Sequence, residues 1–210
     1  MPKIVVYGTP VSTYVRTVRL LLEEVGANYD LKSVDIFNGE NTSTEYLAKH
    51  PFGKVPTIEV DGEAIYESAA ITSYLNMILA NEKFSPADPL PRSRMHQMVS
   101  IIDNYLYPPA ILTIVIQRLI VPSQGGQTDE AAVKAAVAPT QKAIAAIEAL
   151  AVGSPYLLGS EVSIADFYLI PIFIYLSKTP EFDGLMAQAP NLQAWWQTVR
   201  DLPIVKKVCG

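Results

Sequence analysis

A serine stands where a strand-like segment gives way to a helix-like one, and its hydroxyl could take part in chemistry. Ser12 follows the β-rich run 3–8 and directly precedes a helical pattern that begins near Thr13. A serine in this place caps the free amides at the start of a helix. The same hydroxyl, together with the positive end of the helix dipole, also favours a bound anion. The sequence leaves both roles open for Ser12.

Two more motifs have both a structural and a ligand-binding interpretation. Val55-Pro56 opens a strand-like run, where a proline is either a simple edge residue or forms a cis peptide bond at low cost. Glu67-Ser68 begins a helix. This pair either caps the helix or forms an anion site made of the first amides and the Ser68 hydroxyl.

The composition argues against several other kinds of chemistry. The net charge is −5 with a sequence pI near 5.1, and no basic patch favours a nucleic acid partner. The one cysteine, Cys209, excludes an internal disulfide and fits a reducing cytoplasm. No cysteine lies near Ser12, so thiol–disulfide exchange is disfavoured there. The two histidines, His50 and His96, are far apart and lack paired cysteines, so no metal site is expected.

A membrane-spanning or exported protein is not expected either. The longest fully apolar stretch, residues 168–176, has about half of the roughly 20 residues that a membrane span needs. The chain opens on Met1-Pro2-Lys3-Ile4 and enters a strand-like run at once, without the apolar core of a signal peptide. We therefore expect a cytoplasmic protein without a membrane partner.

The elements that must position these motifs alternate between strands and helices over residues 1–83. The β-rich runs are residues 3–8, 29–36, 55–60 and 63–66, and the helical patterns are residues 13–25, 45–49 and 67–79. Asp61-Gly62 is a strong hairpin signal between the last two strands. The order β-α-β-α-β-β-α predicts a small mixed sheet with helices on both faces, in which the first two strands are parallel and the last two antiparallel.

The rest of the chain is predicted to be a separate helical domain. Residues 84–91 contain three prolines, which predicts a stiff linker. Only helices are expected over residues 92–210, and the first of them is long and bends at Pro108-Pro109. Ser163 and Asp166 form a capping-box pattern at the start of a buried helix.

Four segments along this pattern resemble the glutathione S-transferase family in their order and spacing. They are the turn 7–12 running into residues 16–19, the loop 50–56, the helix start 67–71 and the capping box 163–166. The resemblance implies an α/β thioredoxin-like N-terminal domain, followed by an all-α C-terminal helical domain that carries an electrophile pocket. Serine-type, phi-like members are the most similar, partly because Tyr107-Pro108 fits a proline in the first long helix of that class.

The resemblance implies that glutathione is the cosubstrate and that no metal or tightly bound cofactor takes part. Ser12 would donate to the glutathione thiolate, which is then added to a small apolar electrophile. Val55, held by the cis bond to Pro56, would present its backbone to the cysteine residue of glutathione. Glu67 and Ser68 would bind the γ-glutamyl end.

Three residues bear on the glycine end of glutathione. Lys54 would neutralise the glycine carboxylate, or it is a solvated loop lysine. Asn41 and Thr42 stand where phi-like relatives often carry a histidine and a lysine, so they depart from the family pattern. Their neutral side chains would bind the glycine carboxylate more weakly.

The remaining family roles each compete with a structural role for the same residue. Tyr7 could replace Ser12 beside the thiolate, but it stands one residue too early and fits a packed strand residue better. The resemblance implies a homodimer. Asp103 could reach across the interface to the ligand's ammonium group, or Asp103 could be a structural acid on a helix. The candidate residues of the electrophile pocket, which plain core packing would also explain, are Val11, Tyr107, Ile111, Ile114, Val115 and Tyr168.

Two rival functions remain open. A glutathione-dependent isomerase or peroxidase would have the same first domain and differ only in its apolar pocket. A non-enzymatic protein-binding module is the other rival, since a fold alone does not fix a function. The ligand-binding motifs named above are intact, which argues against such a module, whereas the departures at Asn41 and Thr42 favour it.

Overall fold

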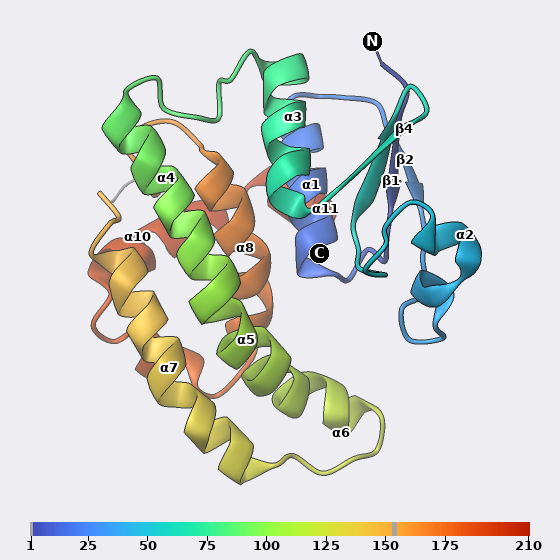
Figure 1. The fold of residues 1–210 in the computed structure, drawn as a ribbon. Coiled ribbons are helices and arrows are strands. Elements are labelled where there is room, and N and C mark those ends of the chain that lie inside the picture. The colour runs from blue at the N-terminus through green and yellow to red at the C-terminus, as the bar shows by residue number, and fades with distance from the viewer. Residues whose placement is uncertain (1, 153–154) are drawn as a thin grey trace. The chain divides into compact units, whose positions relative to one another are not determined.

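Four short strands form a mixed sheet in the first part of the chain (Figure 1). The computed structural model describes residues 2–152 and 155–210. β1 is parallel to β2 and antiparallel to β3, and β3 is antiparallel to β4, which is the topology expected from the sequence. The strands lie in the order β2-β1-β3-β4 and comprise β1 (Ile4–Tyr7), β2 (Asp30–Lys32), β3 (Thr57–Val60) and β4 (Glu63–Tyr66).

Helices cover both faces of this sheet (Figure 1). On one side lie α1 (Thr13–Glu24), α3 (Ser68–Ala80) and α11 (Pro203–Cys209), and on the other lies α2 (Thr44–Leu47), preceded by the short helix η1 (Glu40–Thr42). Successive side chains of a strand point to opposite faces. Val5 and Tyr7 of β1 therefore pack with Val34 and Tyr46 on the α2 side, while Val6 is fully buried toward the other side.

Three strands are shorter than the sequence pattern predicts, and β1 lacks one residue at each end. β2 ends at Lys32 because a turn follows, in which the carboxylate of Asp35 accepts hydrogen bonds from the amides of Phe37 and Asn38 at 2.9 and 3.1 Å. β3 begins after Pro56, since proline has no amide hydrogen to give to the ladder.

Contacts divide the chain into two units. The first holds Met1–Phe84 and Pro203–Gly210, and the second holds Ser85–Leu202. The predicted helical domain, residues 92–210, wrongly includes the final helix α11. This helix belongs to the first unit because its apolar side is buried and it packs against α1, a contact that no local pattern reveals.

The proline-rich segment 84–91 is not a linker along its whole length. Phe84 is buried and belongs to the first unit. The helix α4 (Pro89–Ile101) begins at Pro89 rather than at Arg92. Prolines fit the first turn of a helix, where amides have no helical partner, so here they start the helix instead of preventing it.

The second unit is built from helices. One continuous segment contains α4, η2 (Ile102–Leu106), α5 (Tyr107–Pro109), η3 (Ala110–Ile120) and α6 (Val121–Ser123), and the others are α7 (Glu130–Glu148), α8 (Ile164–Leu176), α9 (Phe182–Met186) and α10 (Pro190–Val199). η2 and η3 are π-helical and flank Pro108-Pro109, which cannot donate to the usual helical ladder. The segment Pro89–Ser123 is long and apolar enough to cross a membrane, judged by length and composition alone. The core helix of a soluble protein meets the same criteria.

The predicted capping box forms, and it is part of a buried network. Asp166 is fully buried and accepts hydrogen bonds from the amide and hydroxyl of Ser163 at 2.8 and 2.7 Å. It also accepts from the amide of Leu157 at 3.0 Å and from the indole of Trp195 at 2.8 Å. Burial raises the pKa of Asp166, while these hydrogen bonds act in the opposite direction. One carboxyl group thus ties the start of α8 to the preceding loop and to α10.

Asp166→Ala should lower the free energy of unfolding by about 3 kcal/mol or more, because several buried donors lose their partner. Equilibrium denaturation in urea, followed by circular dichroism, measures the change. Glu161→Ala removes an exposed acid nearby and should change the free energy of unfolding by less than about 0.5 kcal/mol. Equally small effects in the two variants would contradict a stabilising role for the network.

Candidate active site

The register of the sheet brings the three predicted motifs to the same end of its strands, where Tyr7, Thr57 and Tyr66 lie next to one another. We call this end of the strands the sheet edge. Tyr7, the last residue of β1, pairs with Thr57, the first residue of β3. Thr57 also pairs with Tyr66, the last residue of β4. Three motifs adjoin these strand ends: the turn that holds Ser12 follows β1, Val55 and Pro56 directly precede β3, and Glu67-Ser68 directly follows β4. The sequence predicted each motif singly, and the strand register places them together.

Ser12 lies at the start of α1, in a turn that is braced by its neighbours. Its Oγ accepts from the amide of Val15 at 3.5 Å, a long bond that identifies Ser12 as the N-cap. The buried side chain of Arg16 donates from Nε to the carbonyl of Pro10 at 3.0 Å and so fixes the turn before the serine. Capping uses the hydroxyl oxygen as an acceptor, so its hydrogen can still be donated to an anion. The two roles predicted for Ser12 are therefore compatible.

The loop before β3 lies directly against this turn. The Val55–Pro56 peptide bond is cis, as the resemblance implies. Gly8 has a φ of +153°, and a Cβ there would lie 2.5 Å from Cγ2 of Val15 and 3.2 Å from Cβ of Val55. Only a glycine lets β1, α1 and the loop approach this closely.

The start of α3 has free amides rather than a side-chain cap. Glu67 is exposed and has a φ of 69° and a ψ of 118°, an unusual conformation for a residue with a side chain. The side chain of Glu67, the N-cap residue, makes no capping hydrogen bond to this helix. Glu67 therefore does not cap α3 with its side chain, and the anion-binding role of Glu67 and Ser68 stays a prediction. The positive φ of Glu67 left no signal in the sequence.

The structure gives Asn41 and Thr42 partners inside the protein. The side-chain amide of Asn41 donates to the carbonyl of Gly53 at 2.7 Å, and the hydroxyl of Thr42 donates to the carbonyl of Gly39 at 2.7 Å. The side chain of Lys54 is exposed. Its backbone carbonyl accepts from the buried hydroxyl of Tyr46 at 2.7 Å, a contact that the sequence does not signal.

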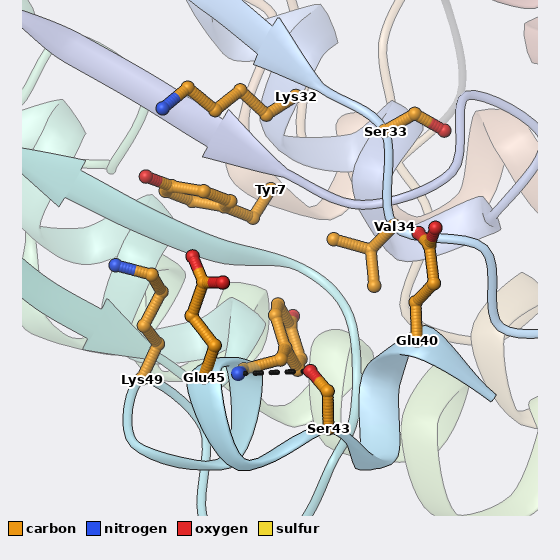
Figure 2. Close-up of a pocket in the computed structure, with 9 residues that line it drawn as sticks. Tyr7, Lys32, Ser33, Val34, Glu40, Ser43, Glu45 and Lys49 are labelled. Atoms are coloured by element: carbon orange, nitrogen blue, oxygen red, sulfur yellow. Dashed lines mark hydrogen bonds between the residues drawn. The ribbon is translucent and has the colours of Figure 1, made fainter.

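Tyr7 is buried in the strand, as predicted, rather than beside Ser12. Its hydroxyl donates to Glu59 at 2.7 Å, and the ammonium groups of Lys49 and Lys32 lie 5.0 and 5.3 Å from the centre of its ring. Hydrogen bonds from Lys49 and Tyr7 hold the pKa of Glu59 below its usual value. Tyr7 also lines a hollow of about 370 Å³ on the α2 side of the sheet, with residues shown in Figure 2 such as Lys49 and Glu45.

The candidates in the second unit are mostly core residues by their burial. Ile111, Ile114, Val115 and Tyr168 are at most 8% exposed, whereas Tyr107 and Asp103 are half-buried. Val11, in the first unit, is 48% exposed. Their roles in an electrophile pocket or at a subunit interface stay predictions. Within the described ranges, acidic, histidine and cysteine side chains do not gather into a group that could hold a metal ion.

Comparison with known proteins gives the same family along most of the chain. Residues 11–78 match the family described as glutathione S-transferase, N-terminal domain, and residues 105–203 match the family described as glutathione S-transferase, C-terminal domain. A probable glutathione S-transferase, GSTF1 from Oryza sativa subsp. japonica, is 34% identical over 100% of this chain and 97% of its own length.

Solved structures agree with this match. Glutathione transferase F7 from Populus trichocarpa superposes with a TM-score of 0.83 at 30% identity, over 98% of this chain and 97% of the other. Glutathione S-transferase I from maize, in complex with an atrazine glutathione conjugate, gives a TM-score of 0.83 at 27% identity, over 98% and 96% of the two chains.

The fold thus defines a transferase with a thioredoxin-like domain and a helical domain. The chain belongs to the glutathione S-transferase family, and its plant relatives confirm the resemblance to phi-like members.

Gly8→Ala should lower the free energy of unfolding by about 1–3 kcal/mol more than Gly62→Ala, because the new methyl group overlaps Val15 and Val55. Gly62 is the matched control, since it also has a positive φ, +95°, but no atom lies within 4 Å of its Cβ position. Urea denaturation of both variants measures the difference. Equal losses would show that the site does not depend on this close approach.

Proposed function

We propose that this glutathione S-transferase binds glutathione at the edge formed by β1, β3 and β4, and holds its sulfur as a thiolate beside Ser12. The thiolate then attacks the electrophilic carbon of an apolar substrate and forms a C–S bond, while the electron pair displaced from that carbon leaves with a departing group or, in an addition, is protonated by water. The observation that carries this proposal is the strand register, which brings the Ser12 turn, the Val55-Pro56 loop and the start of α3 to one edge.

The chemistry depends on the ionisation state of the glutathione thiol. A free thiol has a pKa of about 8.5, so only a few per cent is thiolate near neutral pH. The Ser12 hydroxyl can donate to the sulfur, and the positive end of α1 favours its negative charge. Each unit by which the thiol pKa falls corresponds to about 1.4 kcal/mol of preferential stabilisation of the thiolate.

The remaining groups at the edge suit the polar parts of the tripeptide. The backbone amide and carbonyl of Val55 would pair with the cysteine residue of glutathione. The free amides of α3 and the Ser68 hydroxyl would bind the γ-glutamyl carboxylate, while Glu67 would bind its ammonium group. Lys54 would neutralise the glycine carboxylate, helped little by Asn41 and Thr42, which already have partners in the protein.

The electrophile would bind in an apolar pocket of the helical unit, and Tyr107 and Ile111 are among its candidate residues. The maize relative whose structure holds an atrazine glutathione conjugate supports conjugation of apolar, aromatic compounds. This activity is typical of detoxification in the cytoplasm. We further propose a homodimer, in which Asp103 reaches toward the ligand's ammonium group.

Ser12→Ala should raise the pKa of the bound glutathione thiol and lower kcat, because the thiolate loses its hydroxyl donor. The ultraviolet absorbance of the thiolate, titrated against pH with bound glutathione, measures the shift. The variant should lose only about 1 kcal/mol of stability, as expected for a helix cap.

Asp129→Ala is the matched control, because Asp129 caps α7 in the other unit through the amide of Ala132 at 3.0 Å. It should cost a similar amount of stability and leave the thiol titration unchanged. An identical titration curve for Ser12→Ala and the unmodified protein would refute the role of Ser12.

Ser68→Ala should raise the Kd for glutathione by about tenfold, the cost of one hydrogen bond to a carboxylate, and change kcat little. Calorimetric titration measures the affinity. Ser73→Ala, at an exposed position of the same helix, should bind glutathione like the unmodified protein. An unchanged Kd for Ser68→Ala would exclude the serine from the γ-glutamyl site.

A further inference from the structure

Side chains of η1 and α2 hold two consecutive carbonyl groups of the loop before β3. The side-chain amide of Asn41 donates to the carbonyl of Gly53, and the hydroxyl of Tyr46 donates to the carbonyl of Lys54, each at 2.7 Å. We call these two contacts the carbonyl clamp. They act on the residues that immediately precede Val55.

The Lys54 carbonyl belongs to the same peptide unit as the Val55 amide. A peptide unit is planar, and in its trans form the carbonyl and the N–H point in opposite directions. A hydrogen bond that fixes the carbonyl therefore also fixes the direction of the Val55 N–H. Tyr46 can in this way aim a ligand-binding group without touching the ligand.

Tyr46 is itself fixed to the sheet. It is only 5% exposed, and its oxygen lies 3.2 Å from Oγ1 of Thr57, a fully buried residue at the start of β3. A phenol has a single proton, which Tyr46 gives to the Lys54 carbonyl, so Thr57 is the donor in the second bond. Burial raises the pKa of Tyr46, which keeps the hydroxyl protonated and able to donate.

Asn41 lies in tight contact with the other carbonyl of the clamp. Gly53 has a φ of 58°, and a Cβ there would lie 2.8 Å from the backbone oxygen of Asn41. The two segments are thus close enough for the short asparagine side chain to span them. This contact gives a structural reason for a neutral residue at a position where the resemblance implies a cation.

We infer that Asn41 and Tyr46 are positioning residues for glutathione, acting through the backbone of Val55 on the cysteine residue of the ligand. This inference rests on the proposed binding of glutathione at the sheet edge. The clamp sets the affinity for glutathione, whereas Ser12 sets the ionisation of the thiol, so the two effects can be measured separately.

Tyr46→Phe removes one oxygen atom and keeps the packed ring. The Kd and KM for glutathione should rise about fivefold, the usual effect of one lost hydrogen bond. The KM for the electrophile and the pKa of the bound thiol should stay unchanged, because Ser12 and α1 are untouched. Calorimetry, steady-state kinetics and thiolate absorbance measure these quantities.

Tyr29→Phe is the matched control. The hydroxyl of Tyr29 accepts from Arg19 at 3.1 Å and donates to Glu23 at 3.0 Å, away from the loop, and burial raises the pKa of Tyr29 too. This variant should lose stability but keep its affinity for glutathione. If Tyr46→Phe binds glutathione within twofold of the unmodified protein, the inference is overturned. If the unmodified protein binds no glutathione, the proposed function fails instead.

Asn41→Ala gives an independent test, which also decides the matter if Tyr46→Phe does not fold. Binding is measured for glutathione and for γ-glutamylcysteine, which lacks the glycine. A positioning role through Val55 predicts a similar rise in Kd for both ligands. A rise for glutathione alone would mean that Asn41 contacts the glycine carboxylate directly, and no rise for either would mean that it has no role; both results overturn the inference. Asn38→Ala removes an exposed asparagine of the neighbouring turn, together with its hydrogen bond to Asp35, and should leave both affinities unchanged.

Discussion

The pairing of Tyr7 with Thr57 and of Thr57 with Tyr66 is the constraint on which the site depends. It aligns the end of β1, the start of β3 and the end of β4, so the turns beyond them emerge side by side. A slip of one residue would turn every side chain of a strand to the opposite face. Val6 and Ile58, which are fully buried, would then move to the other face and lose their packing partners, and this cost fixes the register of strands that are only four residues long.

The edge that results suits an anion, although Ser12 itself is uncharged. The first turn of α1 contains no acidic residue, so nothing there opposes a negative sulfur. The serine hydroxyl and the helix terminus need only shift the thiol pKa by one or two units, or about 1.4–2.7 kcal/mol, to make thiolate abundant near neutral pH. In the proposed mechanism the enzyme supplies a positioned nucleophile that belongs to the cosubstrate. Loop geometry matters for this reason, since the backbone contacts proposed for the tripeptide would place its sulfur.

Local signals in the sequence predicted much of this arrangement. The Asp61-Gly62 hairpin, the Ser12 cap and the Ser163–Asp166 capping box each depend on neighbouring residues, and the structure confirms all three. Long-range contacts were not predictable in the same way. The packing of α11 against α1, the hydroxyl of Tyr46 on the Lys54 carbonyl and the positive φ of Glu67 leave no periodic or compositional signal.

The departure at Asn41 shows how a sequence pattern can be incomplete. A neutral residue there predicts weaker binding of the glycine carboxylate. Its amide, however, is committed to Gly53, which only the folded loop reveals. The same segment that weakens one ligand contact can therefore hold another in place.

The most direct measurement is a calorimetric titration of the unmodified protein with glutathione near neutral pH, repeated in two buffers with different enthalpies of ionisation. The difference in heat between the buffers gives the number of protons released on binding. A thiolate beside Ser12 predicts one glutathione per chain and the release of roughly one proton for each molecule bound. Binding without proton release would show that the thiol stays protonated, and no binding at several millimolar would show that the sheet edge is not a glutathione site.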